Sequence, residues 1–175
     1  KKIVDGILKS INEDHKEVQH FDSSPLPDKE KIYQLIRDIF IILYPGYFGH
    51  SEMSFETINM RIGYRVARVY EELRPQVLRE LIHGCQRGPE HCGQCERAAE
   101  MMVMAFLENI PALRASLDLD VKAAFVNDPA AVNYDEIIFS YPGLEAVSVY
   151  RVAHFFYASG LRLIPRIMTE WAHSR

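Results

Sequence analysis

Apolar residues recur along most of the chain at the spacing of an amphipathic helix. The clearest run consists of Ile32, Leu35, Ile36, Ile39, Phe40 and Leu43. Asp28 precedes this run and can accept hydrogen bonds from the first free amides of a helix, and a Tyr-Pro-Gly turn follows it at 44–46. These signals predict a helix that begins after Asp28 and ends at Tyr44.

The same spacing predicts further helices in the rest of the chain. They are expected over 55–83, 98–109, 111–126, 129–140, 143–158 and 161–173. Pro75 marks a kink or break in the first of them, and Gly84 ends it. Pro111 fits the first turn of a separate helix, and Asp128 followed by Pro129 is interpreted as the cap and first position of the next. Because no segment alternates like a strand, we expect an all-α fold, an irregular bundle of about seven or eight helices.

The N-terminal segment has apolar residues on a charged background. They are Ile3, Ile7, Leu8, Ile11 and Val18, a set that suits a helix laid against a partner surface. The chain of 175 residues is 48% apolar, which is typical of one globular domain that folds without a disulfide or metal. We therefore expect a single α-helical domain over 1–175, with an N-terminal helix within 1–22 that can move on its own.

Charge and cysteine content narrow the class of protein. The chain has 20 Lys and Arg against 24 Asp and Glu, and a pI of about 6.0, so it lacks the basic footprint of a nucleic-acid or membrane-surface binder. No uncharged stretch reaches the roughly 18 residues of a membrane helix, and no signal-peptide core is present. We expect a cytoplasmic protein whose three cysteines are reduced thiols.

A cluster of possible metal ligands lies between the two longest helical segments. It contains His83, Cys85, His91, Cys92 and Cys95. The Cys-x-x-Cys spacing at 92–95 matches half of a zinc site, which Cys85 and one histidine would complete. However, the usual second half at a distance is missing, so the sequence favours a loop whose thiols hold no ligand.

Other polar candidates have simpler interpretations. His154 lies on a predicted helix among apolar residues, where an imidazole is more often a packing residue than a catalytic base. The arginines at 61, 65 and 68 share a helix face and are expected to pair with nearby acidic residues, namely Glu56, Glu71 or Glu72. Several carboxylates crowd a short stretch, at Asp118, Asp120, Asp128, Asp135 and Glu136. For Asp128 the helix cap is the default role, and reception of an ammonium or hydroxyl group of a small ligand is the alternative.

Residues 117–172 contain a series of motifs in a fixed order. These are Asp118-x-x-Val121-x-Ala123, Asp128-Pro129-Ala130 with Tyr134, Tyr141-Pro142-Gly143-Leu144 with Ala146, Tyr150-Arg151-Val152-Ala153-His154, and Gly160. In order and spacing this segment resembles the N-terminal helical domain of the serine O-acetyltransferases. This segment makes up about a third of the chain. Residues 1–100 resemble the same family more loosely.

The resemblance implies transfer of an acetyl group from acetyl-CoA to the hydroxyl of L-serine, giving O-acetylserine for cysteine biosynthesis. In that family a His–Asp pair acts as the general base, and it lies in a left-handed β-helix of hexapeptide repeats after the helical domain. The resemblance therefore implies no catalytic residue within 1–175 and no activity of these residues alone. It implies one substrate-binding residue, Asp128, and no cofactor held by this domain, with acetyl-CoA as the co-substrate of the complete enzyme.

The resemblance also implies partners. The family assembles as a hexamer, two trimers joined through the helical domains, and can bind cysteine synthase through a C-terminal tail beyond residue 175. It implies no role for His154 beyond packing. The alternative interpretation is a stand-alone helical domain that binds other proteins and whose loop at 83–95 is held together by a zinc ion.

Overall fold

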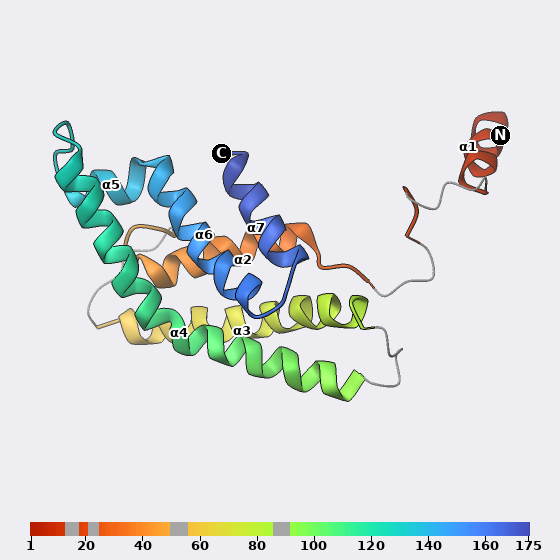
Figure 1. Cartoon of the computed structure of the whole chain (residues 1–175), viewed down its shortest axis with the longest axis horizontal. Helices are drawn as coiled ribbons and strands as arrows, with labels where there is room; N and C mark the ends of the chain where they lie inside the picture. Colours follow the sequence, from red (N-terminus) through yellow and green to blue (C-terminus); the bar gives the residue numbers. More distant parts are fainter. Residues whose placement is uncertain (13–17, 21–24, 50–55, 86–91) are drawn as a thin grey trace.

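The computed structural model describes residues 1–12, 18–20, 25–49, 56–85 and 92–175. Within these ranges the chain forms helices and no strand, which confirms the predicted all-α class. The helices are α1 (Lys2–Asn12), α2 (Lys29–Leu43), α3 (Ile58–His83), α4 (Cys92–Asn127), α5 (Tyr134–Ser140), α6 (Pro142–Ala158) and α7 (Leu163–His173). Figure 1 shows α2 to α7 packed together, with α1 apart from them near the N-terminus.

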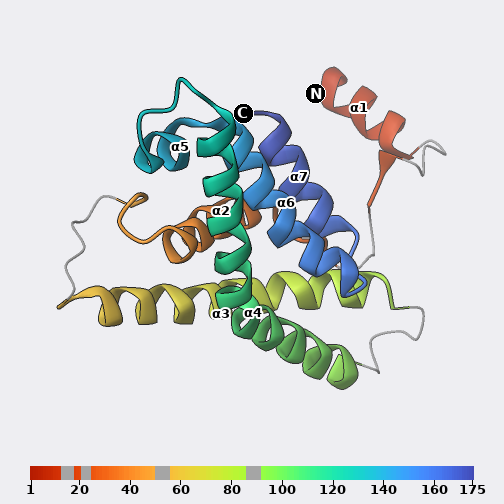
Figure 2. The same ribbon diagram turned by 60° about the vertical axis from the view of Figure 1, so that its left-hand side comes forward.

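The central helix is α2, which contacts α3, α4 and α7. As predicted, the Asp28 carboxylate accepts hydrogen bonds from the Glu30 and Lys31 amides, at 2.9 and 3.2 Å. Nine of the fifteen residues of α2 are buried, including the whole predicted apolar face. Each fully buried aliphatic side chain contributes roughly 1.5–3 kcal/mol, so packing of this face accounts for much of the stability of the bundle. Figure 2 shows α2 above α3, with α4 crossing in front of it.

The helix break predicted at Pro111 is absent, and of the kink or break predicted at Pro75 the structure shows no break. Pro75 lies inside α3, and Pro111 lies inside α4, which is a single helix of 36 residues rather than two. A proline inside a helix costs about 3 kcal/mol because it removes one hydrogen bond and crowds the preceding turn. Buried residues flank both prolines, with Leu73 and Val77 at 0% exposure in α3 and Leu113 at 7% in α4. Packing of α3 against α4 therefore outweighs the local preference for a break.

The start of α7 is capped by a residue far away in the sequence. Glu80 of α3 is 7% exposed, and its carboxylate accepts hydrogen bonds from the amides of Arg162, Leu163 (2.7 Å) and Ile164 (2.8 Å). These amides have no partner within their own helix, because the first turn of any helix leaves its donors free. Glu80 thus fixes the position of α7 relative to α3. It also satisfies donors that would cost about 1–3 kcal/mol each if buried without a partner.

The first helix, α1, has no buried residue. Its apolar side chains range from Ile11, 37% exposed, to Ile3, 79% exposed. The helix lies inside the segment that the sequence predicted, and residues 13–17 lie outside the described part of the chain. Its contact with a partner surface and its mobility stay predictions, as does the assignment of 1–175 to one domain.

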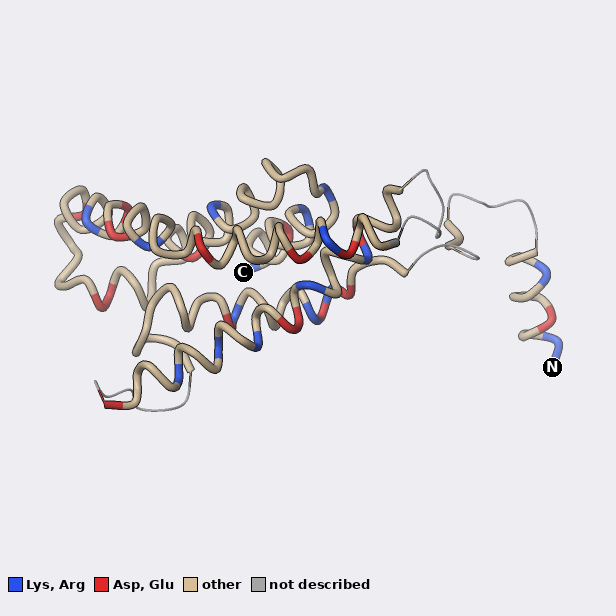
Figure 3. Tube along the Cα trace, turned by 90° about the horizontal axis from the view of Figure 1, so that it is seen from below, with Lys and Arg blue, Asp and Glu red and all other residues tan. Residues whose placement is uncertain are grey.

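Charged residues are spread over the bundle. Figure 3 shows acidic and basic positions interspersed along the helices rather than separated into two regions, as the balanced composition predicts. None of the helices that the structure describes combines the length and apolar character needed to cross a membrane.

Candidate substrate-binding site

Asp128 lies in the turn that connects α4 to α5. Its amide donates to the carbonyl of Ala124 (3.1 Å), and its own carbonyl accepts from the amide of Ala131 (3.1 Å). One carboxylate oxygen, Oδ1, accepts a hydrogen bond from the Ala130 amide at 2.9 Å. A side chain that bonds the backbone two residues later forms an Asx-turn, a conformation that Asp favours and that reverses the chain. The Asp-Pro pair therefore ends α4 with a turn that carries the carboxylate.

The second carboxylate oxygen of Asp128 is held by a tyrosine from beyond α5. The Tyr141 hydroxyl donates to Oδ2 at 2.6 Å. This hydrogen bond and the one from the Ala130 amide favour the charged form and lower the pKa of Asp128. The same contact raises the pKa of Tyr141 to about 12. At neutral pH the pair is therefore a carboxylate and a neutral phenol that donates to it.

The predicted helix over 129–140 starts later than expected. It begins at Tyr134, and its cap is Asn133, whose side-chain oxygen accepts from the Glu136 amide at 2.8 Å. The Glu136 carboxylate reaches back to the Val132 amide at 2.8 Å. These two contacts resemble a capping box, and they start the helix at Tyr134 rather than directly after Asp128. Asp128 is therefore not a helix cap, so its carboxylate is not committed to the donors of a helix.

The turn leaves Asp128 able to bind a ligand. The residue is half-buried, and each of its carboxylate oxygens accepts one hydrogen bond from the described part of the chain. An ionised carboxylate has about four lone-pair sites, so two contacts leave further capacity for an ammonium or hydroxyl donor. Tyr141 and Ala130 fix the direction of the carboxylate. Because the side chain is already ordered, ligand binding has a smaller entropic cost.

The other carboxylates of this stretch do not join Asp128. Asp120 pairs with Arg151 through two contacts of 2.6 and 2.7 Å, and Asp118 pairs with Lys122 one helical turn away, at 2.6 Å. The remaining two act locally. The Tyr47 hydroxyl donates to Asp135 at 2.6 Å, which raises the pKa of Tyr47, and Glu136 completes the cap of α5. Crowding in the sequence therefore reflects separate structural contacts rather than one acidic site.

Two arginines of this face of α3, Arg65 and Arg68, have a different partner from the expected one. The sequence favours pairing with Glu56, Glu71 or Glu72. The structure instead places Arg65 Nη1 2.7 Å from Oδ1 of Asp38, and Arg68 Nε 3.0 Å from Oδ2. Asp38 is 1% exposed and belongs to the apolar face of α2. Because packing of α2 on α3 creates this contact, no local pairing rule could find it.

The histidine and cysteine candidates are only partly described. His91 and the side chain of Cys92 lie outside the described residues. The His83 ring contacts that of His20, with centroids 5.5 Å apart, and Cys85 and Cys95 are half-buried. Among the residues that can be described, no three His, Cys, Asp or Glu side chains come together as a metal site would require. Because His91 and the side chain of Cys92 fall outside this part of the chain, the zinc hypothesis for 83–95 stays a prediction.

His154 is exposed on α6, so it is not part of the core packing that the sequence suggested. Its ring stacks on that of Tyr150, one helical turn earlier, with centroids 5.8 Å apart and an interplanar angle of 24°.

No family model matches the chain, but its similar sequences and its similar solved structures are both serine acetyltransferases. A plasmid serine acetyltransferase of Synechococcus elongatus is 37% identical over 153 residues, which is 86% of this chain and 48% of that relative. The crystal structure of Entamoeba histolytica serine acetyltransferase 1 in complex with L-cysteine is similar to this chain, with a TM-score of 0.63 and 27% sequence identity. The match covers 99% of this chain and 57% of the Entamoeba chain. The chain is homologous to serine acetyltransferases. It spans their helical N-terminal region, about half the length of the Synechococcus relative.

A shorter match covers about a third of the chain. The serine acetyltransferase of Synechocystis sp. is 44% identical over 57 residues, or 33% of this chain and 23% of that relative. This length agrees with the third of the chain in which the sequence resembles serine acetyltransferases.

One residue of the site was not anticipated from the sequence. Tyr141 belongs to one of the motifs that carry the resemblance, but no role was predicted for its hydroxyl, which orients Asp128. The two residues are 13 positions apart and are separated by α5, so their contact depends on how α5 packs between them. The Tyr-Pro-Gly sequence at 141–143 is the signal that could have drawn attention to this tyrosine.

Proposed function

We propose that this chain is the helical N-terminal domain of a serine O-acetyltransferase that transfers acetyl from acetyl-CoA to the hydroxyl of L-serine in cysteine biosynthesis. The homology over 86% of the chain supports this assignment. The observation that carries it within the structure is the Asp128 carboxylate, ionised and oriented by Tyr141 and by the Ala130 amide.

On this proposal Asp128 binds L-serine and takes no part in proton transfer. Its lowered pKa makes it a poor base at neutral pH but a good partner for a cation or a hydroxyl donor. The ammonium or the hydroxyl group of serine would donate to the carboxylate, which would hold the substrate in one orientation. The His–Asp general base would come from the β-helix that the resemblance implies. Residues 1–175 alone would then release no CoA from acetyl-CoA and serine.

The helical domain also supplies contacts between subunits on this proposal. The apolar side chains of α1 are exposed, as they would be in a helix whose partner is another chain. A complete enzyme would then be a homo-oligomer, with a dimer of trimers as the expected form.

The test is steady-state kinetics of the complete enzyme carrying Asp128→Ala. We expect the serine KM to rise about tenfold or more, since a charge-assisted contact is worth about 1.5–3 kcal/mol. The acetyl-CoA KM should stay unchanged. Asp118→Asn is the matched control, because Asp118 is an exposed carboxylate whose ion pair with Lys122 lies within α4. Unchanged serine kinetics in Asp128→Ala would overturn the assignment of Asp128.

A further inference from the structure

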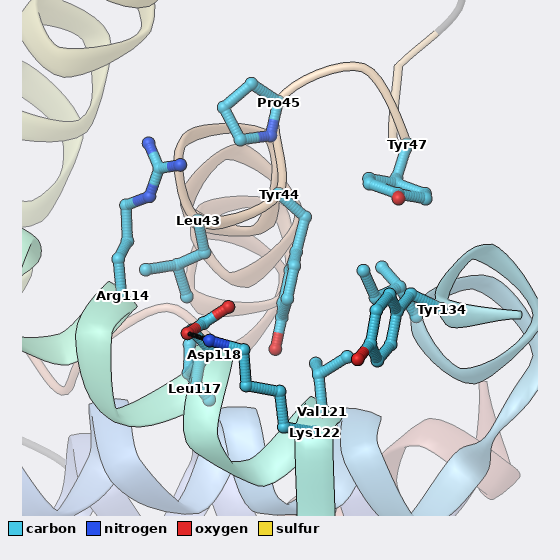
Figure 4. Close-up of a pocket in the computed structure, with 11 residues that line it drawn as sticks. Leu43, Tyr44, Pro45, Tyr47, Arg114, Leu117, Asp118, Val121, Lys122 and Tyr134 are labelled. Carbon is cyan, nitrogen blue, oxygen red and sulfur yellow. Dashed lines mark hydrogen bonds and ion pairs between the residues drawn. The ribbon is translucent and has the colours of Figure 1, made fainter. Parts of the chain in front are cut away.

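A pocket lies between the end of α2, the second half of α4 and the start of α5. Its volume is about 330 Å³, at the lower end of the range typical of small-molecule sites. Its lining includes the buried side chains of Leu43, Leu117 and Val121, and the ring of Tyr44. Figure 4 shows these side chains converging, with Arg114 on one side and Tyr134 on the other. Asp128 does not line it, so the pocket is separate from the proposed serine site.

The charged groups of this pocket are unbalanced. Two cations, Arg114 and Lys122, line it together with one carboxylate, Asp118. Lys122 is neutralised, because its ammonium lies 2.6 Å from Asp118 Oδ2. Arg114 makes no hydrogen bond or ion pair with any residue that the structure describes. The guanidinium extends past Leu43 towards Pro45, as Figure 4 shows, and it is a lining cation that no carboxylate of the described residues neutralises. That charge favours a monoanion.

The uncharged lining favours an aromatic ligand. The rings of Tyr44, Tyr47 and Tyr134 all face the pocket, and aromatic rings attract other planar rings in offset or edge-to-face contacts. The Tyr44 hydroxyl is engaged by Ser148 at 2.8 Å, and the Tyr47 hydroxyl by Asp135 at 2.6 Å. The Tyr134 hydroxyl has no such partner among the described residues, so a polar group at the far end of a ligand can bind it.

We propose that this pocket binds a small aromatic monocarboxylate. The carboxylate pairs with Arg114, whose planar guanidinium matches its two oxygens. The ring lies over the apolar floor formed by Leu117 and Val121, and a hydroxyl at the opposite end of the ring reaches Tyr134. This inference does not rest on the proposed acetyl transfer, since it uses neither Asp128 nor a substrate of that reaction.

Calorimetric titration of the intact protein with 4-hydroxyphenylacetate tests the proposal. We expect saturable binding to one site per chain, with a Kd below about 10 mM. Arg114→Gln should weaken binding about tenfold, because the variant loses the charge but keeps a polar side chain of similar length. Arg97→Gln is the matched control: Arg97 is also an exposed arginine of α4, but it lies outside the pocket, so its replacement should leave the Kd unchanged.

A second ligand separates charge recognition from simple aromatic binding. Tyramine has the same phenol ring but ends in an ammonium group, so it should bind at least about tenfold more weakly than 4-hydroxyphenylacetate. Circular dichroism should show the same helix content in both arginine variants, because both side chains are exposed. The proposal is overturned by the absence of saturable binding, by equal affinities for the two ligands, or by an Arg114→Gln variant that binds like the unmodified protein.

Discussion

Two parts of the chain share a Tyr-Pro-Gly turn followed by Tyr-Arg-Val-Ala, at 44–46 and 64–67 in the first half and at 141–143 and 150–153 in the second. The first tyrosine, Tyr44, is 7% exposed and shares a hydrogen bond with Ser148 in the core. Burial raises its pKa. The second, Tyr141, is half-buried and donates to Asp128, which raises its pKa to about 12. The same tripeptide therefore supports the core in one place and a candidate binding site in the other.

The two arginines of these segments differ in the same way. Arg65 shares with Arg68 a carboxylate that is 1% exposed, Asp38. Arg151 forms a one-to-one ion pair with Asp120, and the two side chains are 36% and 25% exposed. Since charge pairs gain strength as they leave water, the first pair should matter more for stability than the second. The comparison shows that a motif fixes the local shape of the chain, while its surroundings decide what the side chains do.

The largest expected effect is the loss of the cations around Asp38. Replacing both Arg65 and Arg68 with Gln leaves a buried carboxylate without a counter-charge, which should lower the free energy of unfolding by about 3 kcal/mol. Arg151→Gln should cost no more than about 1 kcal/mol, because Asp120 can still reach water. Urea denaturation of the three proteins checks the difference. Equal losses in the two variants would mean that the burial of Asp38 has no energetic consequence.

The next effect distinguishes the two tyrosines. Tyr44→Phe removes a hydroxyl from the core and leaves Ser148 with its bond to the Leu144 carbonyl, so we expect a loss of about 1 kcal/mol in unfolding free energy. Tyr141→Phe removes a hydroxyl from a half-exposed position where water can replace it, so its cost should be smaller. Thermal denaturation of both variants is the measurement. A greater loss in Tyr141→Phe would reverse the roles assigned to the two residues.

The smallest effect concerns the pKa of Asp128. Tyr141→Phe removes the hydrogen bond that contributes most to its lowering, so the pKa should rise towards 3.8. A carboxyl whose pKa is lower in the folded state stabilises the fold above its unfolded pKa, and loses that contribution as the pH falls through the folded value. Stability should therefore depend less on pH below about 3.8 in the variant. Carboxyl chemical shifts followed by NMR would show the change, and an unaltered titration would rule out the Tyr141 contact.

The sequence predicted much of the fold because its strongest signals are local. The apolar face of α2, its cap at Asp28, and the end of α3 at Gly84 all depend on neighbouring residues. The prediction failed where tertiary packing opposed a local rule. Pro111 should begin a separate helix, yet α4 continues through it, as α3 continues through Pro75, because the two helices are held by their mutual contact.

The candidate site was predicted less completely than the fold. Resemblance to serine acetyltransferases singled out Asp128, whereas the residue types alone favoured a helix cap that the structure assigns to Asn133. The contact with Tyr141 could not be read from spacing, because it depends on the path of the chain through α5. Asp38 was missed for a similar reason: a single carboxylate on an apolar face reveals its partners only once the helix is packed.

The central claim is that the Tyr141 hydroxyl orients Asp128 for serine binding. The most direct test is to measure serine saturation kinetics of the complete enzyme in two single variants, Tyr141→Phe and Tyr44→Phe. Each variant loses one phenol hydroxyl from a Tyr-Pro-Gly turn, and only one of these hydroxyls touches Asp128. The account predicts that Tyr141→Phe raises the serine KM about threefold to tenfold, since the carboxylate loses its fixed orientation, while Tyr44→Phe leaves it unchanged. An unchanged serine KM in Tyr141→Phe, or an equal rise in both variants, would contradict it.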